Sequence, residues 1–210
     1  MNEKGIIPQF ANYLSLKPYL PIVGNGNGTG FQMKASGLYH QSQIIKQPDV
    51  LNLYTYLDVD MNQSVYKQNW KYYYKMCEAS SSLTYPVHTI SAIDFKEFDI
   101  FRENLLKSLT IDINDLHNCA YQGVHAGCLA GGWFAMYRGV FGLKPREDEL
   151  IISPKFDVPF KNISMNFVYH GNNYNISLNK KQCVIKGQGS LTLSYNGTKI
   201  VHDGQTILRK

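Results

Sequence analysis

The sequence has few charged residues and lacks the charge clusters that mark nucleic-acid-binding proteins. Asp, Glu, Lys and Arg make up 18% of the 210 residues, and the net charge is +5 at pH 7. The lysines are scattered and form no basic run, which disfavours a nucleic-acid partner. Long apolar runs are lacking too, because no stretch reaches the roughly 18 apolar residues of a membrane span and no signal peptide is visible. We therefore expect neither a nucleic-acid nor a membrane partner.

Cysteine is scarce, and its spacing matches neither a zinc site nor a CxxC redox motif. The four cysteines are Cys77, Cys119, Cys128 and Cys183. We expect free buried thiols in a reducing compartment, which points to a cytoplasmic protein. Asn-x-Ser/Thr sequons would matter only if a signal peptide preceded this sequence. They begin at Asn27, Asn62, Asn162, Asn175 and Asn196.

Signatures of common catalytic sites are also missing. The six histidines show no i, i+4 pairing of the zincin type, and no Gly-x-Ser-x-Gly hydrolase motif occurs. We therefore expect no metal site and no bound cofactor.

The pattern of the sequence changes near Pro145. Before this residue, apolar side chains recur at helical spacing. After it, short alternating segments are separated by turn residues such as Asn-Gly and Asp-Gly, which is typical of antiparallel β structure. We therefore expect a mixed fold, mainly α and then β, whose C-terminal part is a small meandering sandwich.

Several segments before Pro145 carry helix signals. A helix is expected from about Asp49, with Pro48 in its first turn. Further helices are expected over SVYKQNWKYYYKM, after the serines of SSSLTYPVHTI with a serine as N-cap, and over EFDIFRENLLKSLTIDI. The apolar stripe of the first helix is expected to consist of Val50, Leu53, Tyr54 and Leu57.

The stretch GVHAGCLAGGWFAMYRGVFG, residues 123–142, is expected to form the last helix, ended by Gly142. Each glycine in a helix interior costs about 0.8–1 kcal/mol relative to alanine. The pair Gly131 and Gly132 therefore indicates that something comes close to this backbone. The sequence leaves open whether that is another helix or a ligand.

Three polar groups are candidates for chemistry. Lys46 and Gln47, ahead of the first helix, are either a solvated pair or a contact for an anion or a sugar. Ser81 and Ser82 either cap the next helix or bind phosphate or a sugar hydroxyl at its start. Glu78, just before them, is a candidate general base or simply a charge near the helix start.

His125 stands at the head of the glycine-rich helix. It is either a structural histidine or a hydrogen-bond donor to an anion at the helix N-terminus.

Taken in order, these pieces resemble the C-terminal part of glycoside hydrolase family 65. The similar motifs, which run from about Gly5 to about Leu178, are GIIPQFANY, IIKQPDVLNLYTYL, WKYYYKMCEASSSLTYPVHTI, NCAYQGVHAGCLAGGWFAMYRGVFGLKP and ELIISPKFDVPFKNISMNFVYHGNNYNISL. The family holds maltose, kojibiose and trehalose phosphorylases and related α-glucoside hydrolases. The resemblance implies that residues 1–146 are a C-terminal portion of an (α/α)6 barrel and residues 147–210 a small antiparallel β domain.

The resemblance also implies chemistry. Family members invert the anomeric configuration with a Glu as general acid, and inorganic phosphate is the co-substrate and nucleophile in the phosphorylases. Carried over to this sequence, Lys46 and Gln47 would contact the glucosyl unit of an α-glucoside disaccharide or glycan. Ser81, Ser82 and His125 would hold phosphate. In a hydrolase, a carboxylate such as Glu78 would activate water instead.

The sequence also departs from the family pattern. The general acid lies upstream of GIIPQFANY in the family, and no Glu here matches its motif. The His-Asp that precedes Ser-Ser in the family is Ala79-Ser80, and the Asp before Gly-Ile-His is Gln122. We therefore expect the C-terminal half of an inverting enzyme, inactive alone and completed by a missing N-terminal half. The alternative is a non-catalytic carbohydrate-binding remnant.

Overall fold

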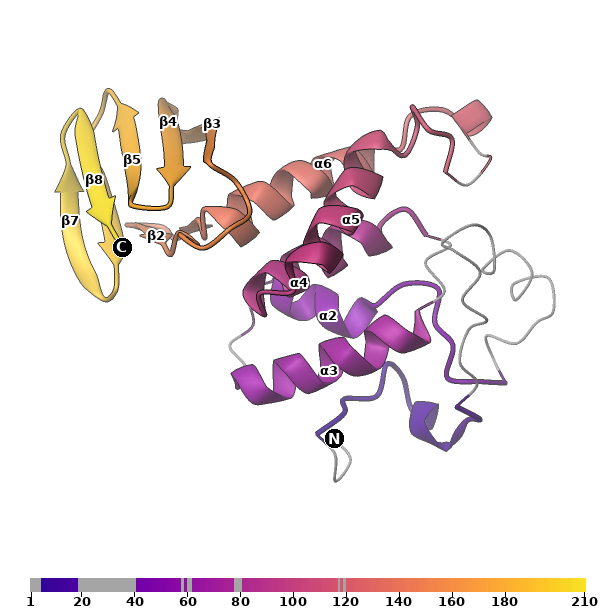
Figure 1. Cartoon of the computed structure of the whole chain (residues 1–210). Helices are drawn as coiled ribbons and strands as arrows, with labels where there is room; N and C mark the ends of the chain where they lie inside the picture. The colour runs from indigo at the N-terminus through magenta and orange to yellow at the C-terminus, as the bar shows by residue number, and fades with distance from the viewer. Residues whose placement is uncertain are drawn as a thin grey trace. The chain divides into compact units, whose positions relative to one another are not determined.

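A computed structural model describes residues 5–18, 41–57, 59, 62–77, 81–116, 118 and 120–210. The chain divides into two compact units, Met1–Ala135 and Met136–Lys210. Helices make up the regular structure of the first unit and strands most of that of the second (Figure 1). The expected order, α and then β, is therefore confirmed, whereas the family-domain boundary at 146/147 stays a prediction.

The helices of the first unit follow the segments that the sequence indicates. Among the described residues they are α2 (Asp49–Thr55), α3 (Gln63–Met76), α4 (Thr84–Asp94), α5 (Phe98–Thr110) and α6 (Ala126–Phe134), with short 3-10 turns η1 (Tyr13–Ser15) and η3 (Ala120–Gln122). Asn62 caps α3, because its side-chain oxygen accepts the main-chain N–H groups of Ser64 at 2.8 Å and Val65 at 3.3 Å. The helix α6 continues into a π-helical turn, η4 (Ala135–Val140), and Gly142 follows in the left-handed conformation with φ 64°.

The N-terminal segment is fastened to α3 by hydrogen bonds. The Asn69 side chain accepts the N–H of Ile7 at 2.9 Å and donates to the carbonyl of Gly5 at 2.9 Å. The Tyr73 hydroxyl donates to the carbonyl of Ile7. Tyr13 is fully buried, and its hydroxyl donates to the carbonyl of Gln43 at 2.5 Å. The GIIPQFANY motif thereby becomes part of the helical core.

The buried stripe of α2 differs from the expected one. Val50 and Tyr54 are buried, as expected, but Leu53 is 40% exposed, and Leu57, which lies beyond the end of the helix at Thr55, is 69% exposed. Leu51 is fully buried in their place. The helix packs on both α3 and α4, so its buried face is set by two neighbours rather than by one stripe at ideal spacing.

The start of α4 also differs from the expectation. Leu83 occupies the N-cap position, with no capping hydrogen bond from a side chain, so the predicted serine cap is wrong. Ser81 contributes its main chain instead, since its carbonyl accepts the N–H of Thr84 at 3.0 Å. Pro86 lies in the first turn, as expected, whereas Pro48 is at the N-cap position of α2 and not in its first turn.

The two central glycines of α6 permit contact with other helices. A Cβ on Gly131 would lie 2.5 Å from Cγ of Pro86 in α4. A Cβ on Gly132 would lie 3.0 Å from Leu109 and 3.2 Å from Ser108 in α5. Real Cβ atoms hardly ever come closer than 3.0 Å to such neighbours. Of the two possibilities that the sequence left open, helix packing accounts for both glycines.

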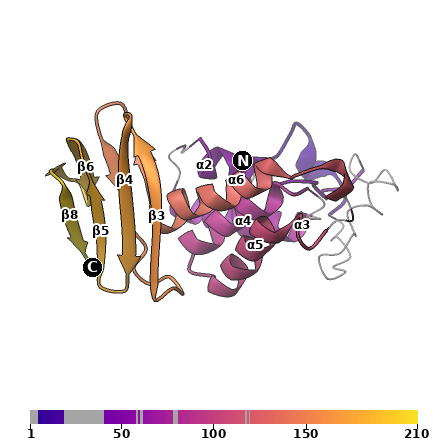
Figure 2. The same cartoon turned by 90° about the horizontal axis from the view of Figure 1, so that it is seen from above.

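The second unit holds two four-stranded sheets. Their strands are β1 (Lys144–Pro145), β2 (Leu150–Ile152), β3 (Asn162–Tyr169), β4 (Asn172–Asn179), β5 (Gln182–Gly187), β6 (Leu191–Tyr195), β7 (Thr198–His202) and β8 (Gln205–Arg209). One sheet has the order β1-β2-β6-β7 and the other β3-β4-β5-β8, the latter strands lying side by side in Figure 2. All pairs are antiparallel except β2 with β6, so the unit is not the simple meander expected.

Tight turns connect the strands of two hairpins at the positions that the turn residues of the sequence predict. His170 and Gly171 join β3 to β4 with φ of 47° and 76°, and Asn196 and Gly197 join β6 to β7 with φ of 51° and 77°. Positive φ at both central residues is the geometry of the two-residue turn that suits twisted strands.

His202 ties the two sheets together. Its ring nitrogens lie 2.9 Å from the hydroxyl of Thr206 and 3.3 Å from the carbonyl of Gly187, and the residue is fully buried. The ring also packs against Tyr174 of β4, with centroids 5.6 Å apart. A strand of each sheet thus contributes to one core, as in a β-sandwich.

Candidate functional site

The first candidate segment, Lys46 and Gln47, lies beside the end of α3 and the start of α4. The N–H of Ile45 donates to the carbonyl of Met76 at 3.0 Å. The carbonyl of Lys46 lies 3.4 Å from the hydroxyl of Thr84 and 3.6 Å from the thiol of Cys77. These main-chain contacts hold the segment in place while the Lys46 side chain remains exposed.

The second candidate segment meets the first. The Ser81 hydroxyl donates to the side-chain carbonyl oxygen of Gln47 at 2.9 Å. Ser82 is half-buried in the same turn, directly before α4. The structure thus brings together Gln47 and Ser81, which the sequence singled out separately. Glu78 lies outside the described residues.

The starts of α4 and α6 lie at the same end of the helical unit. A Cβ on Gly127, in the first turn of α6, would lie 3.1 Å from the side chain of Leu83, just before α4. One turn further along both helices, Gly131 packs on Pro86. The two helices therefore run in the same direction, and the serine turn is near the residue that precedes α6, His125.

His125 contacts a carboxylate that the sequence did not single out. Its Nδ1 lies 2.5 Å from Oδ1 of Asp112, and its main-chain N–H donates to Oδ2 of the same residue at 2.9 Å. Both side chains are 20% exposed. The hydrogen bond from the His125 ring holds the pKa of Asp112 below its usual value, so this group is a carboxylate at neutral pH. No local spacing rule joins two residues 13 positions apart across a helix end, so the sequence held no signal for this pair.

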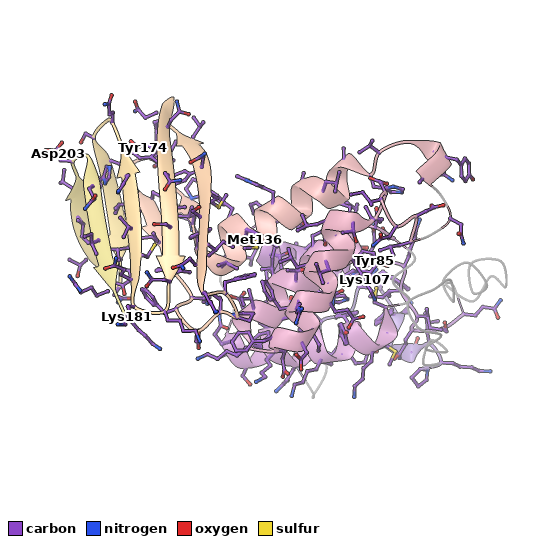
Figure 3. All side chains as sticks on the ribbon, turned by 45° about the horizontal axis from the view of Figure 1, so that its top comes forward. Tyr85, Lys107, Met136, Tyr174, Lys181 and Asp203 are labelled. Carbon is purple, nitrogen blue, oxygen red and sulfur yellow. The ribbon has the colours of Figure 1, made fainter. Side chains whose placement is uncertain are left out.

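The helices that carry the site are held by buried packing. Tyr85 of α4, Ile111 after α5 and Cys128 of α6 form one hydrophobic cluster. Lys107 of α5 lies over the ring of Tyr85, 5.6 Å from its centroid (Figure 3). Ile111 adjoins Asp112 in the chain, and Cys128 is in the first turn after His125. This hydrophobic cluster is therefore next to the contact between Asp112 and His125.

The described residues hold no group of three or more His, Cys, Asp or Glu side chains placed to bind a metal ion. Within the described residues, Cys77, Cys128 and Cys183 form no disulfide; Cys128 and Cys183 are buried, as expected, whereas Cys77 is half-buried. Cys119 lies outside the described residues. No helix in the described part of the chain is long and apolar enough to cross a membrane.

Comparison with known proteins identifies the family. Residues 1–134 match the glycosyl hydrolase family 65 central catalytic domain. The chain belongs to glycosyl hydrolase family 65. The resemblance inferred from the motifs is therefore confirmed.

Individual relatives are phosphorylases. The chain is 46% identical over 180 residues to the 3-O-alpha-D-glucosyl-L-rhamnose phosphorylase of Lachnoclostridium phytofermentans, covering 85% of this chain and 24% of that enzyme. It is 30% identical over 154 residues to the kojibiose phosphorylase of Halothermothrix orenii, covering 72% of this chain and 20% of that enzyme. The chain thus spans about a quarter or less of the length of these curated relatives.

A solved structure has the same fold. The putative kojibiose phosphorylase from human microbiome superposes on the whole chain with a TM-score of 0.84, covering 30% of its own length, at 18% identity. This likeness supports the arrangement of helices followed by sheets, and it carries no further conclusion about chemistry.

Proposed function

We propose that this chain is the C-terminal part of an inverting glycoside phosphorylase that acts on α-linked glucosides. Phosphate, the co-substrate, binds beside the starts of α4 and α6, where Ser82 and His125 supply hydrogen-bond donors. The Ser81 hydroxyl, which donates to Gln47 in this structure, turns to the anion when phosphate binds. Lys46 and Gln47 contact the glucosyl unit. The observation that carries the proposal is the hydrogen bond between Ser81 and Gln47, because it joins the phosphate segment to the sugar segment.

Helix geometry favours an anion at this place. Among the described residues, neither the N-cap side chain of α4 nor that of α6 accepts a first-turn N–H. The helix dipoles add partial positive charge at both N-termini, and the two termini lie close together. Hydroxyls of the serine turn complete a set of donors suited to phosphate.

The rest of the active site is expected outside these residues. In the family pattern, the general acid lies upstream of GIIPQFANY, and the helices α2 to α6 are part of an (α/α)6 barrel. A general acid typically contributes 10²–10⁴-fold to the rate. We therefore expect no turnover of α-glucosides by the 210-residue chain alone, and we expect its partner to be the N-terminal half of such an enzyme.

The competing function is hydrolysis, with Glu78 as the base that activates water. A carboxylate facing bound phosphate would repel it by about 4 kcal/mol per pair of unit charges 4 Å apart at an effective dielectric near 20. Glu78 therefore faces a water in a hydrolase and faces away from the anion in a phosphorylase. The names of the two relatives described above, both of them phosphorylases, favour the second case.

A chimera tests the proposal. The matching quarter of the Lachnoclostridium enzyme is replaced by this chain, and release of β-glucose 1-phosphate from the glucosyl-rhamnose substrate is measured with and without phosphate. We expect phosphate-dependent turnover that survives Glu78→Gln. Phosphate-independent hydrolysis that Glu78→Gln abolishes would favour the hydrolase, and a folded chimera that binds sugar without turnover would favour a carbohydrate-binding remnant.

A further inference from the structure

We propose that the second unit binds an anionic sugar on one face of the sheet β3-β4-β5-β8. The hexose ring lies in a groove of this face, and its acidic group lies beside a cluster of cations at the end of the groove. The site is in the β unit, so it does not depend on the phosphate site proposed beside α4 and α6.

A groove of about 230 Å³ crosses β3, β4 and β5. In the register of the sheet, Ser164 pairs with Ser177, and Ser177 pairs with Val184. Because side chains alternate between the two faces along a strand, these three point away from the buried Leu178 and Cys183 of the sandwich core. The side chains that line the groove on this outer face are those of Asn162, Ser164, Ser177, Asn179, Gln182 and Val184.

Small residues between larger ones make the depression. The row of Ser164 and Ser177 has the pair Asn162 and Asn179 on one side, and on the other side β3 and β4 pair two further asparagines. The serine hydroxyls both donate and accept hydrogen bonds, and each amide offers two donors and one acceptor. Sugar hydroxyls also donate and accept, so an uncharged groove of this kind suits a sugar ring, with Val184 as an apolar contact for its C–H groups.

Several of these amides are already held in one orientation. Oδ1 of Asn179 accepts the main-chain N–H groups of Lys181 at 2.8 Å and Gln182 at 3.0 Å, which leaves its NH₂ group as a donor for a ligand. In the neighbouring row, the NH₂ group of Asn175 donates to Oδ1 of Asn166 at 2.8 Å. Side chains that are ordered before a ligand arrives lose less entropy when it binds.

Four cations gather at one end of this sheet, although the sequence has no basic run. Lys180 and Lys181 form the turn between β4 and β5, and Lys161 directly precedes β3. Arg209 pairs with Gln182, the first residue of β5. All four cationic side chains are exposed, and none has an ion-pair partner among the described residues.

The unpaired charges favour an anionic ligand. Neighbouring strands lie about 4.8 Å apart, and like charges that face each other across strands destabilise a sheet. Asp203 lies at the opposite end of the sheet from Lys181, so its carboxylate does not offset them (Figure 3). Ser164 is three residues from Lys161, about 10 Å along the strand, a span that a hexose phosphate and a lysine side chain together cover.

Three probes test the site by NMR on the 210-residue protein. Glucose 6-phosphate carries both halves of the proposed ligand, glucose carries only the ring, and inorganic phosphate carries only the anion. We expect glucose 6-phosphate to shift the backbone amide signals of β3, β4 and β5 saturably. Glucose and inorganic phosphate should each bind there about ten-fold or more weakly, because each makes only part of the contacts.

Substitutions examine the groove and the cations separately. Ser177→Val fills the groove with a residue that strands favour, and it should abolish binding of glucose 6-phosphate. Asn173→Val is the matched control, because it places the same residue on the same face of β4 but outside the groove, and it should leave binding unchanged. The double variant Lys180→Gln, Lys181→Gln should weaken glucose 6-phosphate binding about ten-fold and leave the weaker binding of glucose unchanged.

Several results would overturn the proposal. Equal affinities of glucose and glucose 6-phosphate would show that the cations take no part, and equal affinities of inorganic phosphate and glucose 6-phosphate would show that the sugar ring is not recognised. Equal binding by Ser177→Val and Asn173→Val would show that the groove is not the site. If Ser177→Val does not fold, the wild-type titrations and the lysine variant decide the question.

The same spectra separate this site from the proposed function. Phosphate shifts at Ser82 and His125, with no glucose 6-phosphate shifts in β3 to β5, would overturn the sugar site and leave the proposed function standing. Glucose 6-phosphate shifts in β3 to β5, with no phosphate shifts at Ser82 and His125, would support the sugar site and count against the proposed function.

Discussion

The side chains of Ser81 and Gln47, 34 residues apart in the chain, are joined by a hydrogen bond of 2.9 Å. Gln47 lies just before α2 and Ser81 just before α4, so the contact connects the starts of two helices. It also fixes the serine hydroxyl as a donor, because the partner atom is the amide oxygen of Gln47.

A double-mutant cycle measures this contact. We predict that Ser81→Ala and Gln47→Ala each destabilise the protein and that the double variant loses less than the sum. The coupling should be about 0.5–1.5 kcal/mol, the net value of a typical hydrogen bond. Urea unfolding of the four proteins gives the four free energies. Strictly additive losses would show that the two side chains do not interact in solution.

The close approach of α6 to α4 predicts a large effect of a small substitution. Gly131→Ala should destabilise the protein by about 1–3 kcal/mol, the usual cost of overpacking, although alanine is the better helix former. The reason is that the new methyl group would lie 2.5 Å from the rigid ring of Pro86. The free energy of unfolding in urea is the measurement.

Gly127→Ala is the matched control for this prediction. Its new methyl group would meet only the end of the Leu83 side chain, at 3.1 Å, and Leu83 is 44% exposed and able to move. The control should be neutral or should stabilise by up to about 1 kcal/mol through helix propensity. Equal stability of the two variants would contradict the packing of α6 on α4.

Buried His88 predicts a loss of stability in mild acid. Burial lowers the pKa of this ring to about 3, from an ordinary value of 6.5. Between these two values the unfolded chain binds a proton that the folded protein does not, so this contribution to stability falls as the pH drops below 6.5. At one and a half pH units below 6.5, the loss from this group is about 2 kcal/mol.

The variant His88→Met removes the titrating group while it fills a similar volume, and no hydrogen-bond partner of Nδ1 is lost within the described structure. The difference in unfolding free energy between the variant and the wild type should move in favour of the variant between pH 7.5 and pH 5, by about 2 kcal/mol. Parallel stability curves of the two proteins over this range would contradict a neutral buried His88.

Local signals in the sequence were sufficient where neighbouring residues decide the structure. Asn196 and Gly197 both have positive φ, the conformation that such a pair favours, and the hairpin lies where the dipeptide predicts it. Paired glycines in an apolar stretch likewise predicted that α6 comes close to a neighbour. Only the structure identified the neighbours as Pro86 and α5.

Local signals in the sequence failed where residues far apart in the chain determine the structure. The parallel pairing of β2 with β6 joins segments separated by three other strands, and no turn residue in the sequence predicts it. Leu53 follows a helical stripe but is exposed, because α2 packs on two neighbours at once, and Leu57 is exposed beyond the end of the helix at Thr55. At the candidate site, Gln47, Ser81 and His125 were recognisable from family motifs, whereas Asp112 becomes visible only when the end of α5 meets the start of α6.

The most direct measurement of the central claim is calorimetric titration of inorganic phosphate into the wild-type chain and into Ser82→Ala, with Ser64→Ala as a control in the first turn of α3. The account predicts saturable binding to the wild type, an equal affinity of the control, and a loss of about ten-fold or more in Ser82→Ala, since a hydrogen bond to a charged group contributes about 1.5–3 kcal/mol. Saturable binding that Ser82→Ala leaves unchanged, or no binding to the wild type, would contradict the phosphate site.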